Sequence, residues 1–237
     1  SNVQTAESQS SITPKTAIEL LKKGNQRFVA NQAMQRDISE QVAQTGTGQY
    51  PFAAVLGCID SRVSAEYVFD QGIGDIFNAR VAGNFVNTDI LGSLEFACKV
   101  AGSKVIVVLG HSSCGAVKGA CDHVQLGNLT HMLGNIQPAL DAITSDYEDK
   151  SSNNAAYVQE VAERNVFLNV SKIKSDSPVL NELYENGEIE KAENLMVADY
   201  DVGGLASSDP YVKATVGDYT KRCKIFTLSP QKKHINL

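Results

Sequence analysis

The sequence lacks long apolar runs and is poor in proline, and both shortages exclude classes of protein. The longest unbroken apolar stretches, such as Phe52–Leu56 and Val105–Leu109, are far shorter than the ~20 residues that a membrane-spanning helix needs. Six prolines and 18 glycines in 237 residues exclude collagen-like and Pro-rich disordered chains. The remaining composition, 43% apolar and 20% charged, is typical of an ordinary globular protein with a sizeable core and no membrane partner.

Basic residues and paired cysteines are also scarce. With 21 Lys and Arg against 27 Asp and Glu, the net charge is −6, which argues against nucleic acid as the main partner, because phosphate binding calls for a clustered basic face. The five cysteines are an odd number in a long chain and do not suggest a disulfide framework. Metal binding or catalysis is the sharper expectation for some of them.

Composition divides the chain into three parts. Residues 1–13 are polar and rich in small residues, and we expect a disordered start in which Ser1 and Asn2 look like the scar of a cleaved tag. Residues 3–13 are also typical of the mature start of an exported protein, so we expect a periplasmic or otherwise exported location, with a cytoplasmic one as the alternative. Residues 14–204 are expected to form one domain. Residues 205–237, with six Lys or Arg against two Asp, form a basic tail of uncertain structure, most simply a solvated extension.

Three continuous apolar runs, rather than alternating ones, predict strands buried on both faces of a parallel sheet. They are followed or separated by segments with helical periodicity, which predicts a βαβα alternation. The expected strands cover residues 52–56, 76–81, 104–110 and 195–200, and the expected helices cover 14–33, 65–70, 88–100, 114–121, 155–174 and 178–186. We therefore expect a single α/β domain with a mostly parallel central sheet flanked by helices.

Two of these strands end in a glycine followed by a residue that can bind metal. Cys58 follows Gly57, and His111 follows Gly110. Ligands of open parallel sheets lie beyond the carboxyl ends of the strands, so Cys58 and His111 converge there if their strands are neighbours. Cys114 comes three residues after His111, on the same face of the turn that opens the next helix. Two thiolates, one imidazole and an open fourth position are typical of a catalytic zinc site.

A carboxylate and a guanidinium lie beside this expected metal site. Asp60 and Arg62 follow Cys58 by two and four residues. Asp60 can either bind zinc or accept a proton from zinc-bound water, and Arg62 can hold Asp60 through paired hydrogen bonds. A surface ion pair beside a structural zinc is the alternative interpretation.

These motifs resemble those of the β-class carbonic anhydrases, in order and in spacing, from about Pro14 to Val202. The matching segments are QYP at 49–51, CIDSR at 58–62, GIGDIF at 72–77, RVAGN at 80–84, SLEFA at 93–97 and HSSCG at 111–115.

The resemblance implies a zinc enzyme that reversibly hydrates carbon dioxide to bicarbonate and a proton, with Cys58, His111 and Cys114 as ligands. It also implies a homodimer, or a dimer of dimers, with the active site at the dimer interface and an N-terminal helical arm packed on the partner. Asp60 and Arg62 would be catalytic, with Asp60 as a possible fourth ligand in a closed state. The substrate-binding residues implied by position, some of them from the neighbouring chain, are Gln49, Phe77, Ala82, Phe96 and Gly115.

The sequence departs from the family pattern at several points. Phe96 stands where many members have Tyr, and Val81 replaces a common Asn. Without any Trp, the chain lacks a residue used in the second bicarbonate site of some members. After Val202 the expected Thr-Gly turn is replaced by Gly203-Gly204-Leu205.

Two alternatives to carbon dioxide hydration stay open from the sequence. The same zinc site could hydrolyse a related small molecule, carbon disulfide or carbonyl sulfide. A non-catalytic zinc or thiol sensor is a different class, in which Cys58 and Cys114 respond to oxidation. The presence of both Asp60 and Arg62 favours the enzymes, because a sensor has no need of them.

Overall fold

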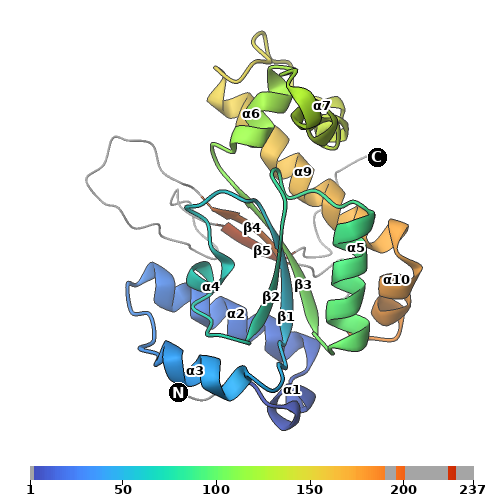
Figure 1. The fold of residues 1–237 in the computed structure, drawn as a ribbon. Helices are drawn as coiled ribbons and strands as arrows, with labels where there is room; N and C mark the ends of the chain where they lie inside the picture. Colours follow the sequence, from blue (N-terminus) through green and yellow to red (C-terminus); the bar gives the residue numbers. More distant parts are fainter. Residues whose placement is uncertain (1–2, 190–195, 201–223, 228–237) are drawn as a thin grey trace.

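The computed structural model describes residues 3–189, 196–200 and 224–227, which fold around one five-stranded sheet (Figure 1). The strand order is β2-β1-β3-β4-β5. The first four strands pair in parallel, and β5 pairs antiparallel with β4. The predicted mostly parallel sheet flanked by helices is therefore confirmed. The strands are β1 (Ala53–Gly57), β2 (Ile76–Arg80), β3 (Val105–His111), β4 (Met196–Tyr200) and β5 (Lys224–Thr227).

Helices cover both faces of the sheet, which explains why the central strands are apolar throughout. All residues of β1 and β3 are buried, because alternate side chains enter the two separate cores. Helices α2 (Pro14–Val29) and α4 (Ala65–Val68) cover one face, and α5 (Thr88–Glu95), α9 (Ala155–Asp176) and α10 (Pro178–Glu185) cover the other (Figure 1). Val55 and Val107 belong to the core on the first face, and Leu56 and Val108 to the core on the second.

The helices agree with the predicted segments within a few residues, and four further short helices were not predicted. The new ones, α1, α3, α7 and α8, have only five to eight residues each. Residues 96–100 continue α5 as one wider π-helical turn. The helices are α1 (Ala6–Ser11), α2 (Pro14–Val29), α3 (Ile38–Thr45), α4 (Ala65–Val68), α5 (Thr88–Glu95), α6 (Gly115–Cys121), α7 (Gly127–Gly134), α8 (Gln137–Asp141), α9 (Ala155–Asp176) and α10 (Pro178–Glu185).

The expectation of a disordered start is wrong for residues 6–11, which form helix α1. Thr5 caps this helix with a reciprocal pair of hydrogen bonds to Ser8. The buried amide of Gln9 donates to the carbonyls of Pro51 and Ala101 at 2.7 and 2.8 Å, which ties α1 to the sheet domain. These two contacts lie 42 and 92 residues away in sequence, so local composition does not reveal them. The expected export of the protein rests on composition alone and stays a prediction.

Helix α2 belongs to the N-terminal arm but packs against the sheet of its own chain. It begins at Pro14, as predicted, after the capping residue Thr13. Leu21 on its apolar face is fully buried against the core on one side of the sheet. The helix ends at Val29, four residues earlier than predicted, because Asn31 adopts a left-handed φ of 55° and donates its N–H to the Phe28 carbonyl.

Part of the predicted basic tail belongs to the sheet. Strand β5 pairs with β4 through Lys224–Thr227, so this segment is not a solvated extension. The other residues of the 205–237 segment lie outside the described residues.

The strand register sets where the chemistry of the chain is placed. Gly57 of β1 lies opposite Leu109 of β3, so Cys58 and His111 leave the sheet at the same edge. This is the carboxyl end of the parallel strands, where ligands of open α/β sheets bind. Among the helices that the structure describes, none has the length and apolarity to cross a membrane.

Candidate metal centre

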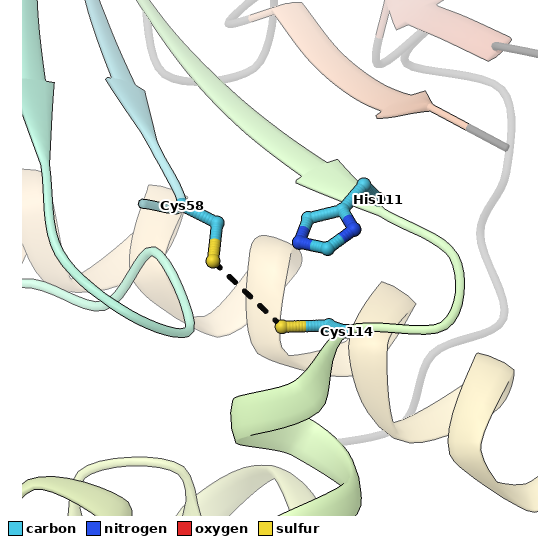
Figure 2. A group of neighbouring side chains, drawn as sticks. All are labelled: Cys58, His111 and Cys114. Atoms are coloured by element: carbon cyan, nitrogen blue, oxygen red, sulfur yellow. Dashed lines mark hydrogen bonds between the residues drawn. The ribbon is translucent and has the colours of Figure 1, made fainter. Parts of the chain in front are cut away.

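Three predicted ligands converge at the carboxyl end of β1 and β3. Cys58 follows β1, His111 ends β3, and Cys114 precedes α6, and Figure 2 shows their side chains facing one another. Their ligand atoms all lie within 4.8 Å of one another, and all three residues are buried. In the described part of the chain this is the one such group of three, and we call it the Cys-His-Cys cluster.

The imidazole of His111 is arranged to leave one ring nitrogen for a ligand bond. Its Nδ1 lies 2.9 Å from the carbonyl of Ser112, which accepts a hydrogen bond from Nδ1–H. Its Nε2 is buried and has no hydrogen-bond partner within the described residues. A buried polar atom without a partner is costly, so the free lone pair of Nε2 fits a metal ion. The pKa of His111 is raised, since burial opposes its charged form but is outweighed by the Cys58 sulfur and Asp60.

The two cysteines form a hydrogen-bonded pair. Their sulfurs lie 3.9 Å apart and share a hydrogen bond, drawn as a dashed line in Figure 2. This hydrogen bond, assisted by His111, lowers the pKa of Cys58, whereas the same bond and burial raise the pKa of Cys114. Cys114 also stands at the N-cap of α6, where helix amides favour a thiolate. A soft divalent ion that displaces the shared proton would be held by both sulfurs.

Asp60 and Arg62 form a bidentate ion pair at the rim of the cluster. The Nε and Nη2 atoms of Arg62 donate to the two carboxylate oxygens of Asp60 at 2.9 and 2.7 Å, and the Arg62 backbone N–H donates at 3.0 Å. These hydrogen bonds lower the pKa of Asp60 to about 2. The carboxylate Oδ2 lies 4.0 Å from Nε2 of His111, next to the cluster but not in its ligand set.

Arg80 fixes the loop that carries these groups, a role that the sequence interpretation missed. Its Nε donates to the carbonyl of Cys58 at 2.7 Å, and its Nη2 donates to the carbonyls of Asp60 and Val63 at 2.6 and 3.1 Å. Its place in the RVAGN motif was the available signal, but the three acceptors become visible only when β2 lies beside β1.

Two of the expected pocket residues adjoin the Cys-His-Cys cluster. Ala82 precedes Gly83, whose N–H donates to the sulfur of Cys58 at 3.4 Å. Gly115 directly follows Cys114 and begins α6 with its amide at the exposed N-terminus. Both residues are therefore direct chain neighbours of groups that contact or form the cluster.

The other three expected pocket residues lie toward the opposite end of the strands of the same chain. Phe77 pairs with Ala54, four residues before Cys58, which corresponds to roughly 13 Å along β1. Phe77 and Phe96 meet edge to face, with ring centroids 6.1 Å apart, and line an open hollow of about 630 Å³. No member of the Cys-His-Cys cluster lines this hollow. Gln49 is exposed and precedes β1, farther still from Cys58.

The remaining cysteines within the described residues are structural. Cys98 and Cys121 are buried and unpaired by disulfides, and desolvation raises their pKa values to about 12 and about 11. The prediction of small apolar fillers is confirmed for both. Cys223 lies outside the described residues.

Comparisons with known proteins agree with this geometry. The sequence model of the carbonic anhydrase family matches residues 53–201. The chain is 36% identical to carbonic anhydrase 2 of Mycobacterium tuberculosis over 177 residues, which is 74% of this chain and 84% of that protein. It is 46% identical to a carbonic anhydrase of Mycolicibacterium smegmatis over 117 residues, which is 49% of this chain and 57% of that one.

Solved structures give the same result for the fold. A tetrameric β-carbonic anhydrase of the ascomycete Sordaria macrospora superimposes with a TM-score of 0.56 at 27% identity, over 68% of this chain and 81% of that one. The Aspergillus fumigatus β-carbonic anhydrase CafA superimposes with a TM-score of 0.57 at 25% identity, over 70% and 78% of the two chains.

Proposed function

The chain belongs to the β-class carbonic anhydrase family, and on that premise we propose which of its residues carry the reaction. The activity is the reversible hydration of carbon dioxide to bicarbonate and a proton, with zinc as the cofactor. The observation that carries the assignment of the site is the convergence of three buried ligand atoms, two sulfurs and one unpartnered imidazole nitrogen, within 4.8 Å.

Cys58, His111 and Cys114 hold the zinc ion in this proposal. Two thiolates and one neutral imidazole match the softness of zinc better than that of magnesium or calcium. The Nδ1 hydrogen bond of His111 supports this ligand set by fixing the ring with Nε2 toward the sulfurs. When bound, zinc supplies Lewis acidity, which lowers the pKa of a water molecule on its open position.

Asp60 and Arg62 orient the reacting water in this proposal. The carboxylate of Asp60 is directed by two guanidinium hydrogen bonds and lies 4.0 Å from Nε2 of His111, within reach of a small molecule between them. An oxygen of Asp60 that accepts a hydrogen bond from this molecule keeps a lone pair of the water pointed at the substrate. Arg62 holds Asp60 outside the ligand set, which supports an open fourth position.

The substrate pocket is completed by a second copy of the chain. Carbon dioxide is neutral and weakly polar, so it calls for an apolar wall, which Phe77 and Phe96 can provide. Phe77 is displaced by roughly 13 Å along the strands from Cys58 of its own chain, and Phe96 packs on Phe77. Phe96 is 51% exposed, and β2, the neighbouring strand, has a free outer edge in the described sheet. A two-fold dimer would place this face of each chain against the other.

A stopped-flow assay of carbon dioxide hydration, with metal analysis of the same sample, tests the proposal. We expect about one zinc per chain and loss of activity on chelation, with recovery when zinc is restored. Full activity in a metal-free sample would contradict the assignment. Carbonyl sulfide and carbon disulfide belong in the same series, because their hydrolysis in the absence of carbon dioxide hydration would assign the site to a different reaction.

A further inference from the structure

A directed chain of hydrogen bonds connects the interior of α9 to the sulfur of Cys58. The Val86 N–H donates to Oδ1 of Asn169 at 2.7 Å, and Nδ2 of Asn169 donates to Oδ1 of Asn165 at 3.0 Å. Nδ2 of Asn165 then donates to the carbonyl of Gly83 at 2.7 Å, and the Gly83 N–H donates to the Cys58 sulfur at 3.4 Å. Every link is buried, and the two asparagines bind the loop between β2 and α5 at two points, Val86 and Gly83.

The two asparagines stand out on the face of α9 that packs into the protein. Their neighbours on that face are mostly apolar, Val161, Val166 and Val170 among them. Asn165 and Asn169 are 2% and 3% exposed, so each amide is stable there only because it is hydrogen-bonded. The bond from Asn169 also fixes which end of the Asn165 amide faces the loop, with its N–H group toward Gly83.

The loop that they hold has an unusual backbone. Gly83 and Asn84 both adopt left-handed φ angles, of 83° and 41°. The φ of Gly83 favours glycine at this position, and a Cβ atom there would also lie 2.6 Å from Cδ1 of Ile136. A backbone of this kind persists where the surrounding structure fixes it.

We propose that Asn165 is a positioning residue for the metal site: it holds Gly83 so that the backbone amide of that residue donates to the Cys58 sulfur. The proposal rests on Cys58 being a zinc ligand. A thiolate that accepts an N–H hydrogen bond gives less electron density to the metal, so the bond sets both the affinity for zinc and the Lewis acidity of the bound ion. Asn169 acts through Asn165 and Val86 in the same way.

The test uses Asn165→Leu, which keeps the approximate volume of the side chain but has no donor for the Gly83 carbonyl. The matched control is Val170→Ala, on the same helix and only 3% exposed but outside the hydrogen-bond chain. Both are prepared with zinc and, separately, with cobalt(II), whose thiolate charge-transfer band reports on the metal–sulfur bond. Thermal unfolding of each variant records its structural cost.

We expect Asn165→Leu to shift the cobalt charge-transfer band and to change the zinc dissociation constant roughly tenfold. Val170→Ala is expected to leave both unchanged, even where its melting temperature falls as far. A folded Asn165→Leu protein with the wild-type band and the wild-type dissociation constant would overturn the proposal.

If Asn165→Leu does not fold, Asn169→Ala carries the same test. It leaves Asn165 in place but removes the hydrogen bond that fixes the orientation of the Asn165 side-chain amide. An unshifted cobalt band in this folded variant would equally overturn the proposal. Failure of the proposed function is a separate result: wild-type protein would then bind neither zinc nor cobalt through Cys58.

Discussion

The guanidinium of Arg62 donates hydrogen bonds to both carboxylate oxygens of Asp60, at 2.9 and 2.7 Å. These bonds hold the carboxylate at the rim of the Cys-His-Cys cluster rather than inside it. The Asp60 side chain is 14% exposed and that of Arg62 is 54% exposed. A pair of this kind, half open to water, contributes little to stability. The ion pair matters instead because it directs the carboxylate of Asp60 toward the Cys-His-Cys cluster.

Arg62→Ala is therefore expected to lower the rate of carbon dioxide hydration on the order of tenfold or more, because Asp60 loses the partner that orients it. Zinc content should stay near one per chain, since no ligand is changed. Stopped-flow rates and metal analysis on the same sample check both statements. Loss of zinc in this variant would show that Arg62 supports the ligands instead.

Asp60→Asn tests the carboxylate itself. The amide has nearly the same shape but is uncharged and has an N–H donor in place of one acceptor oxygen, so it orients the reacting water less well, and turnover is expected to fall roughly 100-fold with zinc retained. The measurement is the hydration rate across pH 7 to 9. Near-normal rates over that range would remove Asp60 from the mechanism and leave it as a structural partner of Arg62.

Cys114→Ser is expected to reduce bound zinc from about one per chain to a small fraction, because a serine hydroxyl stays protonated and is a poor zinc ligand. Cys121→Ala is the matched control: it also replaces a buried cysteine, at the other end of α6, yet should keep the metal. Metal analysis after gel filtration measures the zinc content of both variants. Equal zinc in the two variants would exclude Cys114 as a ligand.

The ionised carboxylate of Asp70, which lies away from the metal site, is expected to make the stability of the fold depend on pH. Burial opposes the charge of its carboxylate, but hydrogen bonds from Arg36, Arg27 and the Met34 N–H outweigh burial and lower its pKa. Because the folded pKa lies below the unfolded value of about 3.9, this stabilisation is complete above that pH and is lost as the pH falls through the folded pKa.

Asp70→Asn isolates that charge, since asparagine tolerates the left-handed φ of 44° at this position. The variant should lose about 1–3 kcal/mol of unfolding free energy at pH 7 and progressively less below pH ~4. Urea unfolding of the variant and the wild type at pH 7 and at pH 3 measures the difference in unfolding free energy. A loss that is equal at pH 7 and at pH 3 would contradict the assignment to the ionised carboxylate.

Phe96→Glu tests the proposed dimer. A charge on this half-exposed ring should disfavour burial against a second chain, so the variant is expected to run as a monomer and to lose activity at least about tenfold while keeping zinc. Leu126→Glu, at an apolar residue that is 67% exposed, is the control. Sedimentation velocity gives the oligomeric state. A dimeric and fully active Phe96→Glu protein would contradict the shared pocket.

Sequence alone determined the parts of this protein that depend on local chemistry. Continuous apolar runs can be buried only between two layers of helices, so they predicted β1 and β3 as central parallel strands. Because each strand ends in a glycine followed by a metal-capable residue, and Cys114 follows His111 by three residues, the three ligands could be named before their distances were known.

Tertiary structure decided what depends on contacts between distant residues. The hydrogen bond from Asn165 to Gly83 spans 82 positions, and that from Gln9 to Ala101 spans 92, so neither the anchored start nor the support of Cys58 leaves a local pattern. The separation of Phe77 from Cys58 follows from the register of β2 on β1, which periodicity does not report. A single sequence shows which side chains can do chemistry, and only the folded chain shows which of them share a site.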